Sequence, residues 1–267
     1  MKALRTYGNR PYSVAVLHGG PGLPGSAAPV AREISKDTGV LEILETRDSV
    51  AGQITELVEV LREHADLPVI LVGHSWGTVL CYVTAARYPK LVKKLILVST
   101  PALEIKDRPE YEPIWLSRLP ERERIELLSL QEAVWDGKGR DKRETMGKLF
   151  RLIVRADSYD QLPEEDDVLE YQPDINMSVG QEFRVMLESK DLLYLGRKIR
   201  CPVVAIHGDY DLRPARVVRE PLSGIIRDFR FHLLEKCGHY PWMERYARDM
   251  FFKVLREEIS HGLAGDK

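Results

Sequence analysis

One serine of this chain stands in a pattern that favours nucleophilic chemistry. Ser75 lies between Gly73 and Gly77 in the pattern Gly-x-Ser-x-Gly, directly after the apolar run 69–72 and before a helix-compatible segment. When a strand turns sharply into a helix, such a serine sits at the apex, and the glycines let the strand and the helix pass close together. The pattern therefore predicts a serine nucleophile that projects into a cleft, beside the first N–H groups of a helix.

An aspartate and a histidine further along the chain could activate this serine. Asp211 follows the apolar run 202–207 by a tight turn, and His239 follows the run 229–234 with Gly238 before it. A serine hydroxyl is a poor nucleophile until an imidazole takes its proton, and the imidazole needs a carboxylate to fix its tautomer. The order serine, aspartate, histidine is expected when all three follow successive strands of one sheet.

Other residues compete for these two roles. Asp209 lies in the same turn as Asp211 and could also form it, but we predict Asp211 as the carboxylate that orients the histidine. None of the other six histidines combines a loop beyond the last strand with a flanking glycine: they are His18, His64, His74, His207, His232 and His261. We therefore predict His239 as the base, and a local backbone or packing role for His18 and His74.

Strands and helices alternate along most of the chain. The expected strands cover 13–17, 40–45, 69–72, 94–99, 202–207 and 229–234, and the expected helices cover 28–37, 50–64, 77–88, 214–224 and 243–258. This alternation predicts an α/β fold with a mostly parallel, doubly wound sheet, in which ligands bind at the C-terminal ends of the strands. The expected site residues all follow those ends.

The stretch 102–198 differs from the rest, because it is rich in charge and in helical periodicity. Helices are expected over 121–135, 141–157 and 178–190, and no buried strand is evident between them. We therefore predict an α/β core formed by 1–101 and 199–267, with 102–198 inserted as a helical cap.

Composition narrows the classes of partner and cofactor. The chain has 267 residues and a formal net charge of -2, so no field of one sign attracts nucleic acid or an anionic membrane. Cys81, Cys201 and Cys237 are far apart and read as reduced thiols. Without a membrane-length apolar run, a metal-ligand motif or a nucleotide loop, we expect a cytoplasmic protein that acts on a small molecule or short peptide without metal or cofactor.

These motifs together resemble the α/β-hydrolase superfamily over the chain outside the insertion. The loop His-Gly-Gly-Pro-Gly at 18–22 and Trp76 after the serine are similar to the proline iminopeptidase branch of serine aminopeptidases. The resemblance implies that Ser75 attacks a carbonyl, that His239 shuttles the proton and that Asp211 orients His239. It also implies that the backbone N–H groups of Gly20 and Trp76 form an oxyanion hole. On composition alone, the loop 18–22 would equally suit a simple turn.

Some segments depart from that branch. His74 stands where the iminopeptidases usually carry a second glycine, and 45–50 lacks their Asp-Gln-Arg-Gly loop. The antiparallel hairpin that usually opens the fold is missing or reduced to a short strand near Leu4 to Tyr7. Such aminopeptidases bind the free amino group of the substrate with cap acids, for which Glu182, Glu188 and the cluster 164–167 are available, although each also reads as a solvated charge.

Three classes of function fit the sequence. The first is a serine hydrolase that cleaves an ester or amide bond through an acyl-enzyme, either as a prolyl-type aminopeptidase or as a general carboxylesterase. The second is a non-catalytic ligand-binding protein that keeps the fold. The third is chemistry without a stable acyl intermediate, such as carbon–carbon bond hydrolysis or cofactor-free peroxide chemistry.

Overall fold

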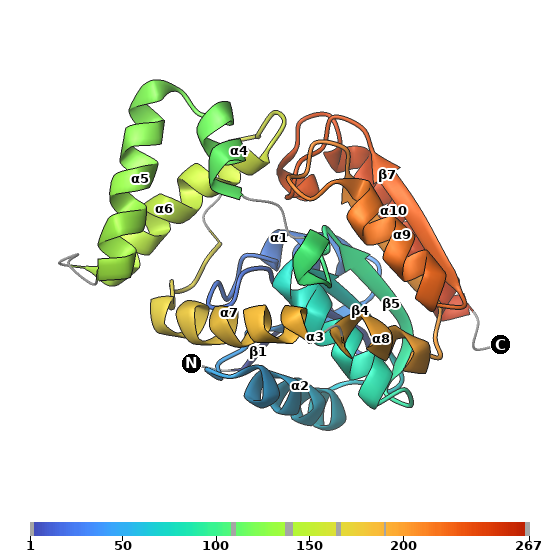
Figure 1. Ribbon diagram of the computed structural model, residues 1–267. Helices are drawn as coiled ribbons and strands as arrows, with labels where there is room; N and C mark the ends of the chain where they lie inside the picture. The colour runs from blue at the N-terminus through green and yellow to red at the C-terminus, as the bar shows by residue number, and fades with distance from the viewer. Residues whose placement is uncertain (1–2, 108–110, 137–140, 164–166, 190, 265–267) are drawn as a thin grey trace.

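A twisted sheet of seven strands forms the centre of the computed structural model, which describes residues 3–107, 111–136, 141–163, 167–189 and 191–264 (Figure 1). The strands are β1 (Leu4–Tyr7), β2 (Tyr12–Leu17), β3 (Gly39–Ile43), β4 (Val69–His74), β5 (Val92–Val98), β6 (Val203–Gly208) and β7 (Phe229–Leu234). Their order across the sheet is β1-β3-β2-β4-β5-β6-β7. Only β1 runs antiparallel to its neighbour β3, which confirms the mostly parallel sheet with a reduced opening hairpin.

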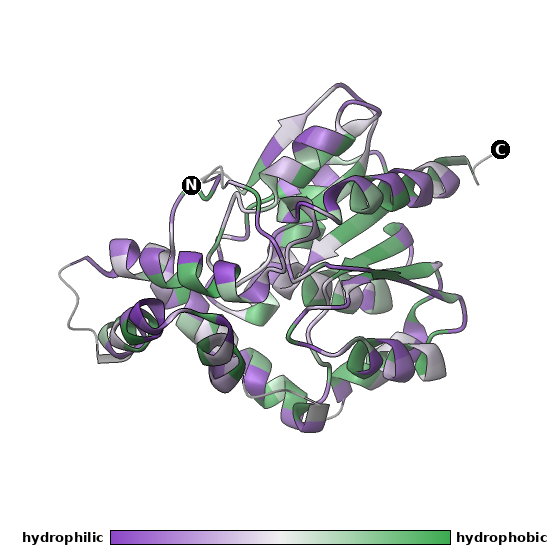
Figure 2. Ribbon diagram, turned by 90° about the horizontal axis from the view of Figure 1, so that it is seen from above, coloured by the Kyte–Doolittle hydropathy of each residue, from purple (hydrophilic) through white to green (hydrophobic). Residues whose placement is uncertain are grey.

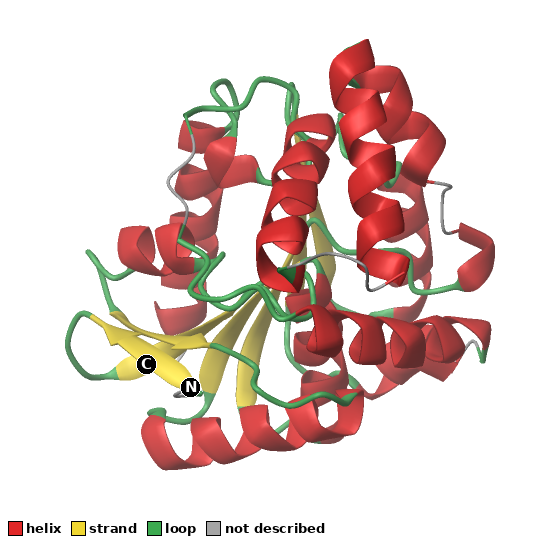
Figure 3. Cartoon of the chain, turned by 90° about the vertical axis from the view of Figure 1, so that its left-hand side faces the viewer, coloured by secondary structure: helices red, strands yellow, loops and turns green. Residues whose placement is uncertain are grey.

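Helices cover both faces of this sheet (Figure 3). One apolar cluster contains side chains of α2 (Val50–His64), α3 (Trp76–Arg87) and α9 (Ala215–Ile225), and the cluster on the opposite face contains side chains of α1 (Ala28–Ile34) and α10 (Arg248–Ala264). Alternate residues of each central strand enter opposite clusters, as Leu71 and Ile70 do in β4. Strands buried on both faces need apolar side chains throughout, which explains the continuous apolar runs of the sequence (Figure 2).

Most predicted core helices occur where the sequence places them. Helix α2 has the predicted bounds, and the Ser49 side chain caps it by accepting a hydrogen bond from the Gly52 N–H at 3.2 Å. The C-terminal helix is the largest deviation, because α10 begins at Arg248 instead of residue 243. Residues 241–243 form a short 3₁₀ turn that starts at Pro241, before the chain enters the helix.

The region between β5 and β6 contains only helices in its described part. They are the 3₁₀ helix η1 (Ile105–Asp107), α4 (Tyr111–Arg118), α5 (Glu121–Asp136), α6 (Lys142–Asp157), α7 (Pro173–Glu188), α8 (Asp191–Tyr194) and η2 (Leu195–Lys198). The predicted helices at 121–135 and 141–157 are confirmed within one residue, whereas α7 begins at Pro173, earlier than expected. Proline favours the first turn of a helix, where its missing N–H leaves no hydrogen bond unmade.

This inserted helical region has two parts that pack differently. Helices α4, α5 and α6 stand together above the sheet (Figure 1) and share a small apolar cluster that includes Leu119, Leu127 and Leu149. Helices α7 and α8 instead contribute side chains such as Val179 and Leu192 to one of the two core clusters. The division into core and cap at the predicted boundaries stays a prediction.

Candidate active site

Ser75 lies at the sharp turn between β4 and α3. Its backbone has φ 48° and ψ -114°, a strained conformation for a residue with a side chain. The N–H of Ser75 donates to the Val98 carbonyl at 3.0 Å, and the N–H of Gly77 donates to the His18 carbonyl at 3.0 Å. A Cβ atom on Gly73 would approach the Gly77 carbonyl oxygen to 2.5 Å, and one on Gly77 would approach the His18 oxygen to 2.7 Å. Both glycines are therefore required sterically, as the pattern predicts.

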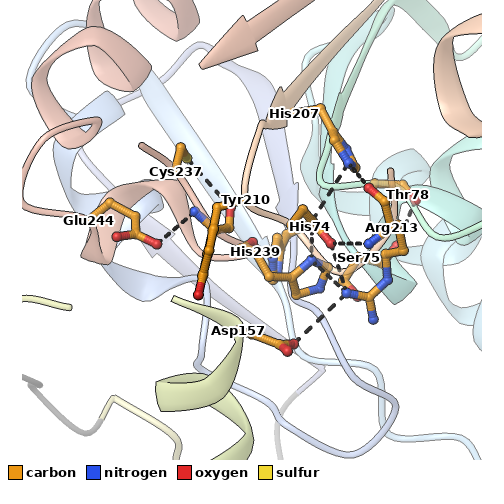
Figure 4. A network of polar contacts seen from close by, with 12 residues as sticks. His74, Ser75, Thr78, Asp157, His207, Tyr210, Arg213, Cys237, His239 and Glu244 are labelled. Carbon is orange, nitrogen blue, oxygen red and sulfur yellow. Dashed lines mark hydrogen bonds and ion pairs between the residues drawn. The ribbon is translucent and has the colours of Figure 1, made fainter. Parts of the chain in front are cut away.

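Asp211 and His239 form a buried hydrogen-bonded pair next to this turn. Asp211 follows β6 and His239 follows β7, so parallel neighbours in one sheet deliver both to the same edge as Ser75. The His239 Nδ1 atom lies 2.7 Å from Asp211 Oδ2. Figure 4 shows Ser75 and His239 close together, and no hydrogen bond of the described residues involves Ser75 Oγ. Hydrogen bonds of catalytic groups often tighten only when substrate binds.

Asp209, the competing acid of the same turn, lies elsewhere. It is exposed, and its Oδ1 atom accepts a hydrogen bond from the Cys237 N–H at 3.1 Å. That bond joins the turn after β6 to the loop after β7. Asp209 therefore holds two loops together, while Asp211 is the aspartate that contacts the imidazole.

The charges around the pair favour a neutral histidine and an ionised aspartate. Burial, followed by the positive charge of Arg213, lowers the pKa of His239 to about 4. Burial alone would raise the pKa of Asp211, but the charges of His239, Arg213 and His207 hold it well below its usual range. At neutral pH the imidazole can accept a proton, and the carboxylate can orient it.

His74 occupies the position at which the resemblance leads one to expect glycine. Its Nε2–H donates to the backbone carbonyl of His239 at 2.9 Å, and its ring packs against the rings of His239, Tyr240 and Trp242. Burial lowers the pKa of His74 well below its usual value. His74 thus has the predicted local role, because it fixes the backbone of the histidine loop.

The two expected oxyanion donors lie in the loop after β2 and at the start of α3. Trp76 is the first residue of α3, so its N–H belongs to those without an acceptor inside the helix. Gly20 follows β2 with φ 55°, and a Cβ there would lie 2.4 Å from Leu23. The neighbouring His18 is buried, and its Nδ1–H donates to the Gly19 carbonyl at 2.9 Å. The roles of Gly20 and Trp76 in binding an oxyanion stay predictions.

The inserted region is hydrogen-bonded to the histidine loop. The buried carboxylate of Glu244 accepts three backbone hydrogen bonds, from Gly238 at 2.7 Å, from Tyr159 at 2.8 Å and from Asp160 at 2.9 Å. In addition, the N–H of His239 donates to the Asp157 carbonyl at 2.9 Å. The segment after α6 and the loop that carries His239 are therefore one hydrogen-bonded unit.

The same region is also hydrogen-bonded to the loop that carries Gly20. The Gln172 N–H donates to the Gly22 carbonyl at 2.9 Å, and the Asn176 side-chain amide donates to the Pro21 carbonyl at 2.8 Å. A Cβ on Gly22 would lie only 2.4 Å from the Gln172 carbonyl oxygen, so the two segments touch closely. Residues 157–160 and 172–176 thus contact the histidine loop and the loop that carries Gly20.

The cap acids expected as candidates for binding an amino group have other partners. Glu182 accepts a hydrogen bond from the Val50 N–H at 2.8 Å, where α2 begins. Asp167 accepts two hydrogen bonds from the Arg32 guanidinium, both at 2.7 Å. Glu188 is exposed, with Arg184 at 4.0 Å. Residues 164–166 lie outside the described residues. No described member of this group lies in contact with Ser75, Asp211 or His239.

Two charged residues beside the triad were missed from the sequence. The buried Asp157 accepts a hydrogen bond from the Trp115 indole N–H at 2.6 Å, and its Oδ2 atom lies 3.9 Å from Arg213 Nη1. Arg213 contacts both Asp211 and His239 (Figure 4). The sequence could have indicated Arg213, because it is a cation two residues after the expected aspartate. Nothing in the sequence indicates that Asp157 lies near that turn.

The buried Asp157 gives a stability prediction. Burial raises its pKa to about 7, above the value of about 4 for an aspartate in an unfolded chain. Between these two pKa values the folded chain binds more protons than the unfolded chain does. The free energy of unfolding therefore falls as the pH rises from about 4 to 7. We expect Asp157→Asn to remove this loss and to be more stable than wild type by about 2 to 4 kcal/mol at pH 8.

Thermal denaturation at about pH 4 and at pH 8 measures the effect of Asp157→Asn. The Asn side chain can still accept the Trp115 hydrogen bond, so the comparison isolates the charge. An equal difference in Tm between variant and wild type at the two pH values would contradict a titrating Asp157.

A cavity of about 220 Å³ lies next to the histidine loop, beyond the ring of Tyr240. Its apolar wall includes Phe150 and Val154 of α6 and Trp242, and its opposite wall comes from α1. Tyr240 lines this cavity and also contacts the His74 ring, with 5.0 Å between ring centroids. The inserted region and the core therefore share a cavity beside the histidine loop, and Ser75, Asp211 and His239 are not among its lining residues.

Within the described ranges, no group of three or more His, Cys, Asp or Glu side chains is arranged to hold a metal ion. No helix of that part of the chain is long and apolar enough to cross a membrane. The three cysteines are free thiols, and Cys81 and Cys237 are buried.

Comparisons with known proteins agree with this fold. Proline iminopeptidase of Heyndrickxia coagulans is 26% identical over 263 residues, which cover 86% of this chain and 85% of that protein. The structure resembles proline iminopeptidase of Mycobacterium smegmatis, with a TM-score of 0.61, 18% identity and coverage of 98% and 96% of the two chains. It also resembles Paleococcus ferrophilus monoacylglycerol lipase, with a TM-score of 0.63, 14% identity and coverage of 97% and 98%. Because residues 46–246 match the family described as alpha/beta hydrolase fold, the chain belongs to that family.

Proposed function

We propose that this protein is a serine hydrolase that cleaves an ester or amide bond of a small substrate through an acyl-enzyme. The observation that carries the proposal is the buried hydrogen bond of 2.7 Å between His239 and Asp211, beside Ser75 on a strained turn. A serine at the start of a helix, a neutral imidazole and an ionised carboxylate are the three groups that acyl transfer requires.

In the proposed reaction, Ser75 Oγ attacks the substrate carbonyl while His239 Nε2 takes the hydroxyl proton. The negative charge that develops on the carbonyl oxygen would be held by the N–H groups of Gly20 and Trp76. One such donor lowers the barrier by about 3 kcal/mol, because the charge appears only as the reaction proceeds. The imidazolium then protonates the leaving group, and the ester formed with Ser75 is hydrolysed by water that His239 activates in turn.

Among substrates, an ester without a free amino group is the first candidate. An aminopeptidase needs an acid that is available to bind the ammonium group of the substrate. The expected cap acids Glu182 and Asp167 are already hydrogen-bonded within the chain. Asp157 lies in the site, but the Arg213 guanidinium already stands beside its carboxylate, and that charge disfavours a second cation at the same place.

A prolyl-type aminopeptidase is the second candidate. It is supported by the relative from Heyndrickxia coagulans, which is named a proline iminopeptidase. The resemblance to a monoacylglycerol lipase is compatible with the ester alternative but rests on the fold alone.

The deciding assay compares a short-chain p-nitrophenyl ester with an L-prolyl arylamide, using wild type and Ser75→Ala. We expect turnover of the ester that depends on Ser75, and little turnover of the arylamide. Efficient cleavage of the arylamide would instead establish the aminopeptidase. Absence of both activities, together with no labelling of Ser75 by a fluorophosphonate, would exclude a serine hydrolase and leave a ligand-binding protein of this fold.

A further inference from the structure

Arg213 lies in the turn that carries Asp211, and its side chain folds back onto the catalytic pair. Its Nη1 atom is 3.1 Å from Asp211 Oδ1 and 3.1 Å from His239 Nδ1, and its backbone N–H donates to the same Asp211 oxygen at 3.0 Å. Only 11% of the Arg213 side chain is exposed. A buried guanidinium is thus in contact with both members of the pair (Figure 4).

The Nδ1 atom of His239 cannot donate a hydrogen bond to Asp211 and accept one from Arg213 at the same time. If Nδ1 carries a proton, it donates to Asp211 Oδ2 at 2.7 Å, and Nε2 is then free to accept the Ser75 proton. If Nδ1 accepts from Arg213, the ring proton is on Nε2, and the imidazole cannot act as a base. The shorter contact with the carboxylate favours the first arrangement, in which Arg213 donates to Asp211 and stands beside the ring as a cation.

Several groups fix this cation in place. Asp157 of the inserted region lies 3.9 Å from Nη1, and the Tyr111 ring lies under the guanidinium at 4.9 Å. His207 donates from Nε2 to the Arg213 backbone carbonyl at 2.8 Å. Asp211 and His239 are the other titratable groups that contact Arg213 among the described residues. On the histidine side, the ring of His74 packs against His239 without carrying a charge at neutral pH.

We propose that Arg213 is a positioning residue, which holds Asp211 in the orientation that Nδ1 of His239 requires and keeps the imidazole uncharged between turnovers. A cation beside Nδ1 repels a second positive charge on the ring, so protonation of the resting base becomes less favourable. The inference rests on the proposed function, since it concerns the base of that reaction. Its consequence is an enzyme that stays active at a lower pH than a triad without the arginine.

The test measures how fast a fluorophosphonate labels Ser75 at pH values from about 4 to 9, in wild type, Arg213→Met, Arg213→Gln and Arg213→Lys. Labelling requires an uncharged His239 but no knowledge of the natural substrate. The acid limb of the pH–rate profile is the range in which labelling slows as His239 becomes protonated. We expect this limb to move upward by about 1 pH unit or more in Arg213→Met and Arg213→Gln, which lack the positive charge. Near pH 4, a shift of about 1 unit slows their labelling by about tenfold relative to their own rates at high pH, against about twofold for wild type. Lysine keeps the charge, so Arg213→Lys should keep the acid limb of wild type.

A purely structural role would give a different result. It would lower the yield of folded protein or the plateau rate of labelling, but the acid limb would stay where it is in wild type. That outcome, or an acid limb of Arg213→Lys that moves as far as that of Arg213→Met, would overturn the inference. The glutamine variant keeps a donor for Asp211 and protects the test against misfolding of the methionine variant.

An NMR titration of the His239 imidazole, assigned with His239→Gln, separates this inference from the proposed function. Wild-type protein that is not labelled at any pH would contradict the serine hydrolase. The imidazole titration would still decide whether Arg213→Met raises the pKa of His239, as we expect. An unchanged pKa in protein whose Ser75 is labelled normally would overturn the role of Arg213 alone.

Discussion

Replacement of Ser75 by alanine is expected to lower kcat for a hydrolysed ester by about 10⁴- to 10⁶-fold, with little change in KM. The hydroxyl is the atom that would bond to the substrate carbonyl, and no neighbouring group can replace it. Steady-state kinetics of purified wild type and variant give the size of the loss, with the active fraction of the wild type counted by fluorophosphonate labelling. Circular dichroism should show the same fold for both, since alanine fits the turn at least as easily as serine.

Ser99 provides a matched control for that substitution. It is fully buried at the end of the neighbouring strand β5, has a positive φ of 51°, and its hydroxyl has no hydrogen-bond partner among the described residues. Ser99→Ala therefore removes an equivalent hydroxyl one strand away. We expect it to retain nearly the full activity; a loss as large as that of Ser75→Ala would show that the assigned nucleophile is wrong.

The second large effect is expected at Asp211. In Asp211→Asn, the side chain can present its NH₂ group to Nδ1, which favours the tautomer with the proton on Nε2. Because that tautomer cannot accept the Ser75 proton, kcat should fall by about 10⁴-fold, as in serine proteases with this change. The steady-state assay on the ester measures this loss, and labelling of Ser75 should slow in parallel.

Asp209→Asn tests whether the position of the acid is assigned correctly. Asp209 lies two residues earlier in the same turn, is exposed, and its side chain accepts a hydrogen bond from the Cys237 N–H. The Asn side chain can still accept that bond, so activity should change by less than about threefold. If Asp209→Asn lost far more activity than Asp211→Asn, the assignment of the acid would have to be reversed.

The architecture could be predicted because parallel strands buried on both faces read as continuous apolar runs. The run 69–72 and the alternation around it were sufficient to predict the order of strands and helices. The glycines at 73 and 77 predict the turn for a steric reason that is local to the chain. The predicted places of Ser75, Asp211 and His239 follow from topology, because neighbouring parallel strands end at one edge of the sheet.

Contacts between the inserted region and the core could not be predicted in the same way. Helical periodicity shows which face of α6 is buried, but not that Asp157 at its end meets the turn after β6. The charge of Glu182 suggested a solvated acid or a substrate contact, whereas the structure uses it at the N-terminus of α2. Such pairings depend on how two distant segments pack together, and nothing in either segment alone specifies the partner.

The contacts of Glu244, Gln172 and Asn176 limit how the inserted region can vary among relatives. A chimera that exchanged the whole insertion would replace the segments whose Asp157 carbonyl, Gln172 N–H and Asn176 side-chain amide bond to the histidine loop and the glycine loop. An exchange restricted to α5, which packs on α6 through the small apolar cluster of this region, would leave those partners in place. Sequence can therefore vary most freely in α5, while residues 157–160 and 172–176 are expected to vary together with the histidine loop and the glycine loop.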